Sequence, residues 1–410
     1  MLELESKCLG FQIGDIYIGT STCADDIALI ESNKDNLQIM INVIGRYAKL
    51  HHYRIHPMKT KIMQYLTPNV EYKWYLDGKE ITTKEDAMHL GIIRSEKNEC
   101  YKNIEARLES ARRPNYALMG SGVHGTNGID DVTSYRIYHT YVLQRLIYGL
   151  EVFPLKTTHV ENLESFHRKS IRYVQSLPKR IATAAIYLLV GAIPIEAELH
   201  QRKLSLLYSM LASDNSNIKE IINRQISVNY DNEDSFFCNI RDILILYDLP
   251  SITVLQAKLP LKISWKKLVR KEVEQFWLKR LQNDATAKTT LKYLAIKHLE
   301  IGTSHPLWKM KSKTRIAVKK SIIKARIIIG TLVLQKDRHR FNKFDVSSIC
   351  PMCRLEDEDI IHFLLKCSLL AGSGQEPFRL LKNEVINNSE DGNWFRIFNN
   401  DERITTLSDN

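Results

Sequence analysis

The sequence is poor in cysteine and has no long apolar run. Its seven cysteines among 410 residues are too few for a disulfide-rich scaffold. The longest mostly apolar stretch, residues 181–195, is interrupted by Gly191 and Pro194 and is shorter than the roughly 20 residues that a bilayer span needs. The chain opens with an acidic segment, where a secretory signal is basic. We therefore expect an intracellular protein, nuclear or cytoplasmic, that does not contact a membrane.

The net positive charge of the chain comes from its middle part. The net charge is +11, but residues 1–97 carry −1 and residues 338–410 carry −3, so residues 98–337 carry +15. An excess in one region favours a polyanionic partner, and RNA or DNA is the expected one. The alternative is a solvated basic surface without a partner. The sequence does not indicate any particular protein partner.

The pattern of apolar residues predicts an α+β fold. The first hundred residues have one helical pattern, over 35–53, among strand patterns over 15–22, 27–30, 61–66, 72–76, 79–82 and 88–93. Asp77-Gly78 suits a type I′ turn between two of these strands. The later pattern predicts helices over 103–118, 132–148, 160–174, 196–211, 262–281 and 313–334, with a kink or break at Pro114. We expect a small antiparallel unit followed by a mainly α-helical region.

Two adjacent carboxylates, Asp25 and Asp26, follow a short strand pattern. Like charges at a tight turn repel each other unless something offsets them, and a divalent cation does so. Neighbouring residues on a strand point to opposite faces, so one of the two would bind the metal directly. The alternative is an ordinary solvated turn.

The succession of motifs around this pair resembles the reverse transcriptases of non-LTR retrotransposons. The motifs are LGFQIGDIY at 9–17, ADD at 24–26, KTKIM at 59–63 and HLGI at 89–92. The resemblance starts at the aspartate hairpin of the palm and continues through a helical thumb-like region to about residue 370. It implies that Asp25 binds Mg²⁺, that Asp26 is its companion, and that Lys59 lies near the nucleotide triphosphate. It also implies that Leu90 and Gly91 belong to a primer grip.

The resemblance covers only the later part of such an enzyme. Only 24 residues precede Asp25, so the fingers and the first palm aspartate have no room. Cys23, His56 and His89 depart from the Tyr or Phe, Asn and Tyr that the family has at these places. We expect a fragment of an RNA-directed DNA polymerase that is inactive alone. The alternatives are a non-catalytic zinc-containing nucleic-acid-binding protein derived from a retroelement, and a remnant or incomplete gene model.

Four residues near the C-terminus have the spacing of a zinc site. Cys350, Cys353, His362 and Cys367 give the pattern C-x2-C-x8-H-x4-C. Zn²⁺ prefers four sulfur and nitrogen ligands in a tetrahedron. The alternative is three free thiols and an unrelated histidine. We expect a structural zinc ion here, and a solvated acidic loop at 356–359. The arrangement also resembles the zinc knuckle that follows the reverse transcriptase in many of these elements.

Residues 301–336 contain nine lysines and arginines and no acidic residue. Such a segment favours phosphate binding, and Trp308 at its start is expected to stack on a base. A weaker patch surrounds Trp265 and Trp277. The alternative is a basic helix face anchored by isoleucines. The residues expected to contact nucleic acid are Lys309, Lys311, Lys313, Arg315, Lys319, Lys320, Lys324 and Arg326.

These features together predict five parts. They are a partial palm at 1–97, a helical thumb-like region at 98–210, a basic helical connection at 211–340, a CCHC zinc knuckle at 341–372 and a polar tail at 373–410.

Overall fold

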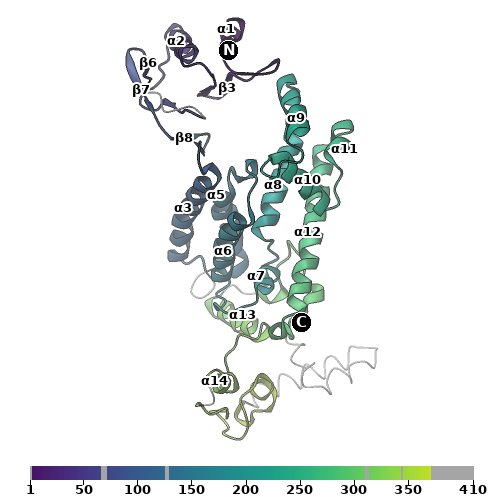
Figure 1. Ribbon diagram of the computed structural model, residues 1–410. Helices are drawn as coiled ribbons and strands as arrows, with labels where there is room; N and C mark the ends of the chain where they lie inside the picture. Colours follow the sequence, from purple (N-terminus) through teal and green to yellow (C-terminus); the bar gives the residue numbers. More distant parts are fainter. Residues whose placement is uncertain (1, 66–71, 125–128, 310–313, 343–344, 371–410) are drawn as a thin grey trace. The chain divides into compact units, whose positions relative to one another are not determined.

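The computed structural model describes residues 2–65, 72–124, 129–309, 314–342 and 345–370 (Figure 1). The predicted polar tail at 373–410 lies outside these residues, as do Lys311 and Lys313. The chain divides into two compact units. The first contains residues 1–110, 145–163 and 198–272, and the second contains 111–144, 164–197 and 273–410.

The strands of the described chain are short and all belong to the first unit. They are β1 Gln12–Ile13, β2 Ile16–Tyr17, β3 Thr20–Cys23, β4 Asp26–Leu29, β5 Lys61–Ile62, β6 Trp74–Leu76, β7 Lys79–Thr83, β8 Asp86–His89 and β9 Ile92–Ser95. The pairs β1–β2, β3–β4, β6–β7 and β8–β9 are antiparallel. The expectation of purely antiparallel pairing is wrong at one place, because β5 runs parallel to β7.

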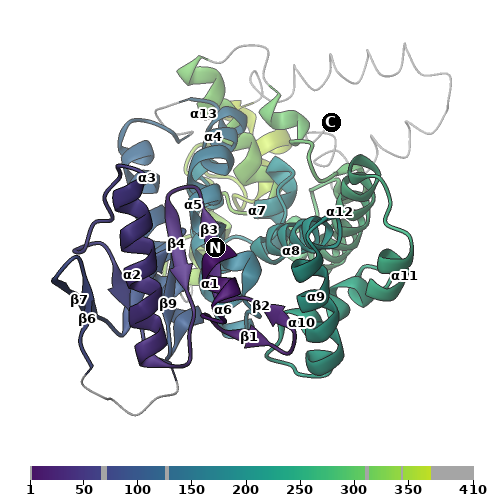
Figure 2. The same cartoon turned by 90° about the horizontal axis from the view of Figure 1, so that it is seen from above.

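Helix α2, Lys34–Leu50, supplies the core of this strand-rich part (Figure 2). Asn33 begins it, since its side chain accepts from the backbone N–H groups of Asp35 and Asn36. Its buried face includes Met40 and Ile41. Ile41 belongs to a cluster with Ile62, Trp74, Leu76 and Ile81, which lie on β5, β6 and β7. The helix predicted over 35–53 is therefore confirmed.

The segment predicted as one strand over 88–93 is two strands. The chain turns at Leu90-Gly91, where φ is +50° and +76°, and β8 and β9 pair on either side. Asp77-Gly78 has the same left-handed conformation, with φ of +53° and +74°, as the predicted type I′ turn requires. Glycine is the residue that adopts such a φ without strain, and both turns contain one.

Most of the remaining described chain is helical. The helices are α1 Leu2–Ser6, α3 Glu99–Gly120, α4 Asp131–Ile137, α5 Gln144–Ile147, α6 Thr157–Val174, α7 Thr183–Val190, α8 Ile195–Leu211, α9 Ser216–Asn229, α10 Phe236–Leu246, α11 Ile252–Ala257, α12 Lys262–Thr286, α13 Arg315–Ile328 and α14 Gln335–Phe341. The shorter 3₁₀ and π segments are Leu150–Val152, Thr289–Leu291, Ile296–His298, Pro306–Trp308, Ser368–Leu370, Tyr138–Leu143 and His362–Lys366. The coarse α+β expectation is thus confirmed.

Three predicted helices differ from the structure in detail. Helix α3 continues through Pro114, so of the predicted kink or break the break is wrong, and a kink stays a prediction. The helix predicted over 132–148 is divided by the π-helical segment Tyr138–Leu143. The last predicted helix ends at Ile328 rather than at residue 334, since Gly330 adopts φ +64° just beyond it.

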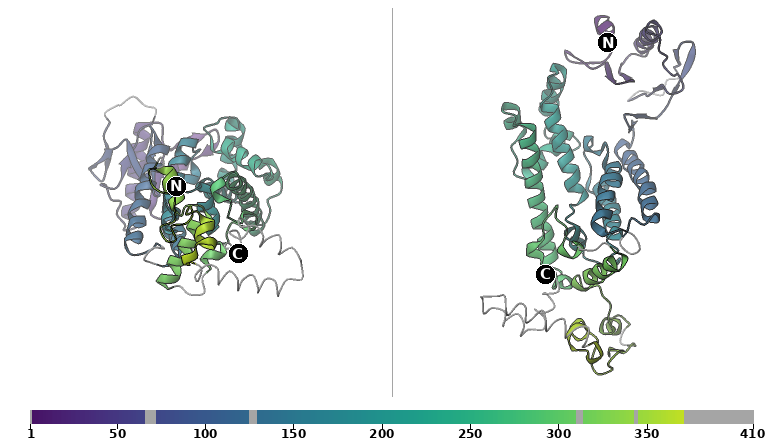
Figure 3. Two further views of the ribbon diagram at one scale, coloured as in Figure 1. Left: turned by 90° about the horizontal axis from the view of Figure 1, so that it is seen from below. Right: turned by 180° about the vertical axis from the view of Figure 1, so that it is seen from behind.

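Helices α8 and α12 lie side by side (Figure 3). Within the first unit, a buried tryptophan joins them. The indole Nε1 of Trp265 donates to the backbone oxygen of Leu204 at 3.1 Å. Trp265 is among the largest fully buried side chains of the protein. Its partnered N–H lets the indole lie in the core without a lost hydrogen bond.

Candidate metal centre and basic surface

Three thiols and one imidazole converge near the C-terminus. Every ligand atom of Cys350, Cys353, His362 and Cys367 lies within 4.8 Å of the others. Cys350 and Cys367 are buried with their Sγ atoms 3.9 Å apart, and Cys353 Sγ lies 3.2 Å from His362 Nε2. Among the described residues, this is the one group of His, Cys, Asp and Glu with such a geometry.

The distances fit a tetrahedral zinc ion. Zn–S bonds of about 2.3 Å and Zn–N bonds of about 2.0 Å place sulfur atoms roughly 3.8 Å apart, and sulfur and nitrogen roughly 3.5 Å apart. The observed separations lie close to both values. The backbone brings the ligands together because Cys350 N donates to Glu356 O at 2.8 Å and Cys367 N donates to His362 O at 2.8 Å. The sequence-predicted ligand set therefore forms one cluster that suits a metal such as zinc.

Two of the thiols have different electrostatic surroundings. The backbone N–H of Leu355 donates to Cys353, and with a similar contact from Glu356 it lowers the pKa of that thiol to about 7. Burial raises the pKa of Cys350. A thiol with a pKa near 7 is substantially a thiolate at neutral pH, which is the form that binds zinc.

The acidic run at 356–359 is only partly a solvated loop: Glu356 and Asp357 are exposed as expected, whereas Glu358 is buried, and the carboxylates also make contacts within the fold. His362 Nδ1 lies 3.3 Å from Glu356 Oε2, and if Nε2 bound a metal, Nδ1 would carry the ring proton and donate it to this carboxylate. Asp359 Oδ1 accepts from His362 N at 2.9 Å, and buried Glu358 accepts from Gln335 N at 2.9 Å. The sequence spacing indicated the ligands but contained no sign of these supporting carboxylates.

Asp25 and Asp26 lie at the tip of the β3–β4 hairpin. Cys23 pairs with Asp26 across the turn, and Ala24 has φ of +54°. Both aspartates are exposed. In the part of the chain that the structure describes, they do not join a third His, Cys, Asp or Glu in a group that could hold a metal. The hairpin thus matches the expected strand–turn–strand, while its binding of Mg²⁺ stays a prediction.

Lys59 lies in a turn after α2. Its backbone N–H donates to His56 O at 3.0 Å, and its side chain is exposed. Nothing in its surroundings tests the predicted proximity to a triphosphate, which stays a prediction.

Leu90 and Gly91, the predicted primer-grip residues, form the turn between β8 and β9. Tyr148 Oη donates to Leu90 O at 3.1 Å, and the Arg107 guanidinium donates to Gly91 O. The guanidinium also lies over the Tyr148 ring, 5.0 Å from its centroid. A Cβ at Gly91 would lie only 3.1 Å from that ring. A larger residue at position 91 would crowd this ring, and the positive φ independently favours glycine in the turn.

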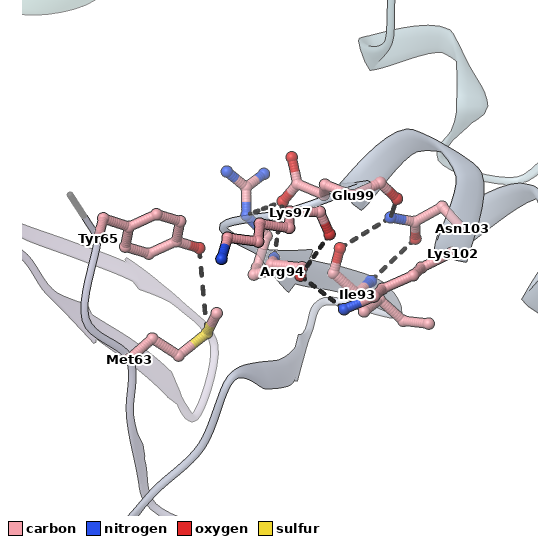
Figure 4. A network of polar contacts seen from close by, with 9 residues as sticks. Met63, Tyr65, Ile93, Arg94, Lys97, Glu99, Lys102 and Asn103 are labelled. Atoms are coloured by element: carbon pink, nitrogen blue, oxygen red, sulfur yellow. Dashed lines mark hydrogen bonds and ion pairs between the residues drawn. The ribbon is translucent and has the colours of Figure 1, made fainter. Parts of the chain in front are cut away.

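An asparagine fixes the adjoining strand to α3 (Figure 4). Buried Asn103 accepts from Ile93 N at 2.9 Å and donates to Ile93 O at 2.7 Å. Glu99 pairs with Arg94 at 2.9 Å beside it. The side-chain amide takes the place of a neighbouring strand, because it satisfies both backbone groups of one residue.

Helix α13 separates apolar from basic residues. Val318, Ile322 and Ala325 are buried, whereas Lys319, Lys320 and Lys324 are exposed. Among the described residues, none of these three lysines forms an ion pair with a carboxylate. Thr314 begins the helix by accepting from Ala317 N at 3.3 Å. Lys309 and Arg315 are exposed as well.

One predicted contact residue also makes a structural contact. Arg326 is partly buried and its Nη2 donates to Ser176 O at 3.0 Å. This hydrogen bond connects α13 to the segment just after the end of α6, and the contact of Arg326 with nucleic acid stays a prediction. Lys311 and Lys313 lie outside the described residues.

The tryptophans of the two basic patches are not available for stacking. Trp308, Trp265 and Trp277 are all buried, at 2%, 1% and 5% exposure. The prediction that Trp308 stacks on a base is therefore wrong. A tryptophan among lysines is also typical of a core anchor with charged neighbours at the surface, and here that alternative holds.

No family model matches the chain, and no curated protein is significantly similar to it. In the described residues, no single helix is both long and apolar enough to cross a membrane, although the bent pair α7 and α8 meets the length and composition criteria jointly.

Proposed function

We propose that this chain binds RNA or DNA without catalysing nucleotide transfer on its own, and that a structural zinc ion organises its C-terminal part. The proposed origin is a non-LTR retrotransposon, on the motifs at 9–17, 24–26, 59–63 and 89–92. The observation that carries the binding proposal is the exposed lysine face of α13.

The lysine face suits a phosphate backbone. Lys319, Lys320 and Lys324 project from one rigid helix whose opposite side is buried in the second unit. Because no carboxylate of the described residues neutralises them, their charge is available to a polyanion. Each lysine that neutralises a phosphate releases counterions, so binding of this kind weakens with salt.

Binding is tested with a charge-reversal variant of the full chain. Changing Lys319, Lys320 and Lys324 to Glu is expected to weaken binding of single-stranded RNA and DNA and to lower the salt dependence. The matched control reverses Lys79, Lys84 and Lys97, three exposed lysines of the strand-rich part, and is expected to bind normally. Equal affinity of the α13 variant and the natural chain would place the binding surface elsewhere.

The absence of polymerase activity is the second half of the proposal. Two-metal nucleotidyl transfer uses carboxylates that clamp both ions. Asp25 and Asp26 come from a single exposed turn, and no third carboxylate of the described residues joins them. We expect purified chain with Mg²⁺, primed RNA and deoxynucleotides to extend no primer beyond an Asp25→Ala control. Extension that depends on Asp25 would favour the rival function, an RNA-directed DNA polymerase.

A further inference from the structure

Helix α14 ends in an exposed aromatic ring that follows two arginines in the last turn. Phe341 is 61% exposed, and the Arg340 guanidinium lies 5.5 Å from its ring centroid. Arg338 and Arg340 are exposed, and neither pairs with a carboxylate in the described part of the chain. An exposed ring close to cations is an arrangement on which unpaired bases stack while their phosphates are neutralised.

Helix α14 is tied to the metal cluster by the acidic run. Glu358 Oε2 accepts from Gln335 N at 2.9 Å, and Glu358 O accepts from Lys336 N at 3.2 Å. Asp359 pairs with Lys336 Nζ at 3.0 Å and also accepts from His362 N at 2.9 Å. The same short segment therefore contacts both the predicted metal ligand and the first residues of α14.

Most acidic residues near α14 and the metal cluster make contacts within the fold. We call residues 334–370 the zinc module. Its structural carboxylates contact backbone N–H groups, a lysine, a serine or His362, and they are Asp337, Glu356, Asp357, Glu358 and Asp359. Asp345 is exposed beyond the end of α14. The arginines of α14 thus keep an uncompensated charge in a module that also contains many acids.

We propose that α14 is a single-strand-binding element whose position depends on zinc. Phe341 stacks on one base, Arg338 and Arg340 contact the adjoining phosphates, and the metal orders residues 356–359 so that α14 is held in place. This inference rests on the proposed nucleic-acid binding, and it assigns to α14 a contact separate from the lysine face of α13. The ligand is single-stranded nucleic acid, either RNA or DNA.

The test uses the full chain with oligouridine and oligothymidine of about 20 nucleotides, longer than the usual single-strand site. Phe341→Ala is expected to weaken binding at least about fivefold. Replacing both Arg338 and Arg340 by Gln is expected to reduce the slope of log affinity against log salt by about 1.4. Arg354→Gln removes an exposed charge from the same module away from α14, and it is expected to bind normally.

The coupling to zinc is tested with two further variants. Glu358→Ala is expected to keep stoichiometric zinc and to lose the same affinity as Phe341→Ala. In Cys367→Ser, which lacks one ligand, adding Phe341→Ala is expected to weaken binding little further. Comparison of the two oligonucleotides distinguishes an RNA ligand from a DNA ligand.

The outcomes separate this inference from the proposed function. Normal binding by Phe341→Ala and by the double arginine variant would overturn the inference and leave the α13 surface intact. If Phe341→Ala weakened binding as much in the zinc-free Cys367→Ser chain as in the natural chain, the proposed dependence of α14 on zinc would be overturned. No binding of either oligonucleotide by the natural chain would overturn both proposals.

Discussion

At the residue scale, the proposed zinc ligands and the carboxylate beside them are expected to respond differently to substitution. Cys367→Ser removes one of the four ligands, so we expect stoichiometric zinc to be lost. Glu356→Gln keeps all four ligands but weakens the contact that orients His362, so we expect stoichiometric zinc with an affinity lower by about 10- to 100-fold. Metal analysis and competition with a chelator measure both.

Either of two results would contradict this assignment. Zinc retained by Cys367→Ser at full stoichiometry would remove Cys367 from the ligand set. An unchanged zinc affinity in Glu356→Gln would mean that the Glu356–His362 contact does not support the metal.

Asp131, the first residue of α4, makes stability depend on pH. It is buried, and neither carboxylate oxygen has a hydrogen-bond partner among the described residues. Burial raises its pKa from 3.8 to about 7. Between these values the folded state binds the proton and the unfolded state does not, so the contribution of Asp131 to stability falls as the pH rises.

Asp131→Asn is therefore expected to be more stable than the natural chain at pH 8, by up to about 4 kcal/mol, and nearly equal to it near pH 4. Denaturation midpoints across this range measure the difference. Asp15→Asn, at an exposed aspartate, is the control and should keep the natural profile. A profile for Asp131→Asn that parallels the natural one would contradict the prediction.

The sequence was informative about residues whose chemistry depends on local spacing. Cys350, Cys353, His362 and Cys367 could be predicted as a set because their separation already limits how they can converge. Trp308 and Arg326 could not be assigned, since a tryptophan or an arginine next to lysines is equally compatible with a buried anchor. Whether such a side chain lies at the surface or in the core depends on partners that are distant in the sequence, such as Ser176 O for Arg326.

At the scale of elements, we expect the side chain of Asn103 to be the main contact that holds the β8–β9 hairpin against α3. Asn103→Ala leaves the N–H and C=O of Ile93 without that partner, which costs about 1–3 kcal/mol. Amide exchange at Ile93 should accelerate. Asn162→Ala, at an exposed position on α6, is the control. Unchanged exchange at Ile93 would mean that neighbouring strand bonds suffice.

Periodicity predicted the type of the longest elements, but it missed helices α7, α9, α10 and α11 and placed several boundaries wrongly. The helix at 35–53 and the Asp77-Gly78 turn were confirmed because both have strong local patterns. The hairpin at 86–95 was missed because the turn Leu90-Gly91 lacks the Asn or Asp that marks a type I′ turn. Arg107 and Tyr148 hold that turn from residues distant in the sequence, so no local pattern could indicate it.

At the scale of the whole molecule, the charge distribution predicts how binding responds to salt. Each phosphate contact contributes about −0.7 to the slope of log affinity against log salt on single strands. Reversal of Lys319, Lys320 and Lys324 should therefore reduce the slope by about 2. Titrations at several salt concentrations measure it. If this variant kept the slope of the natural chain, other basic residues among 98–337, which together carry a net charge of +15, would make the phosphate contacts.

The close approach of the cysteines has a consequence for the oxidation state of the protein. Cys350 and Cys367 have their sulfur atoms 3.9 Å apart, and a disulfide needs about 2.05 Å. A small movement is enough, so air oxidation of the metal-free chain should join them and exclude zinc afterwards. Bound zinc would protect these thiols from oxidation. After the zinc is removed with a chelator in air, full rebinding would require a reductant as well as the metal.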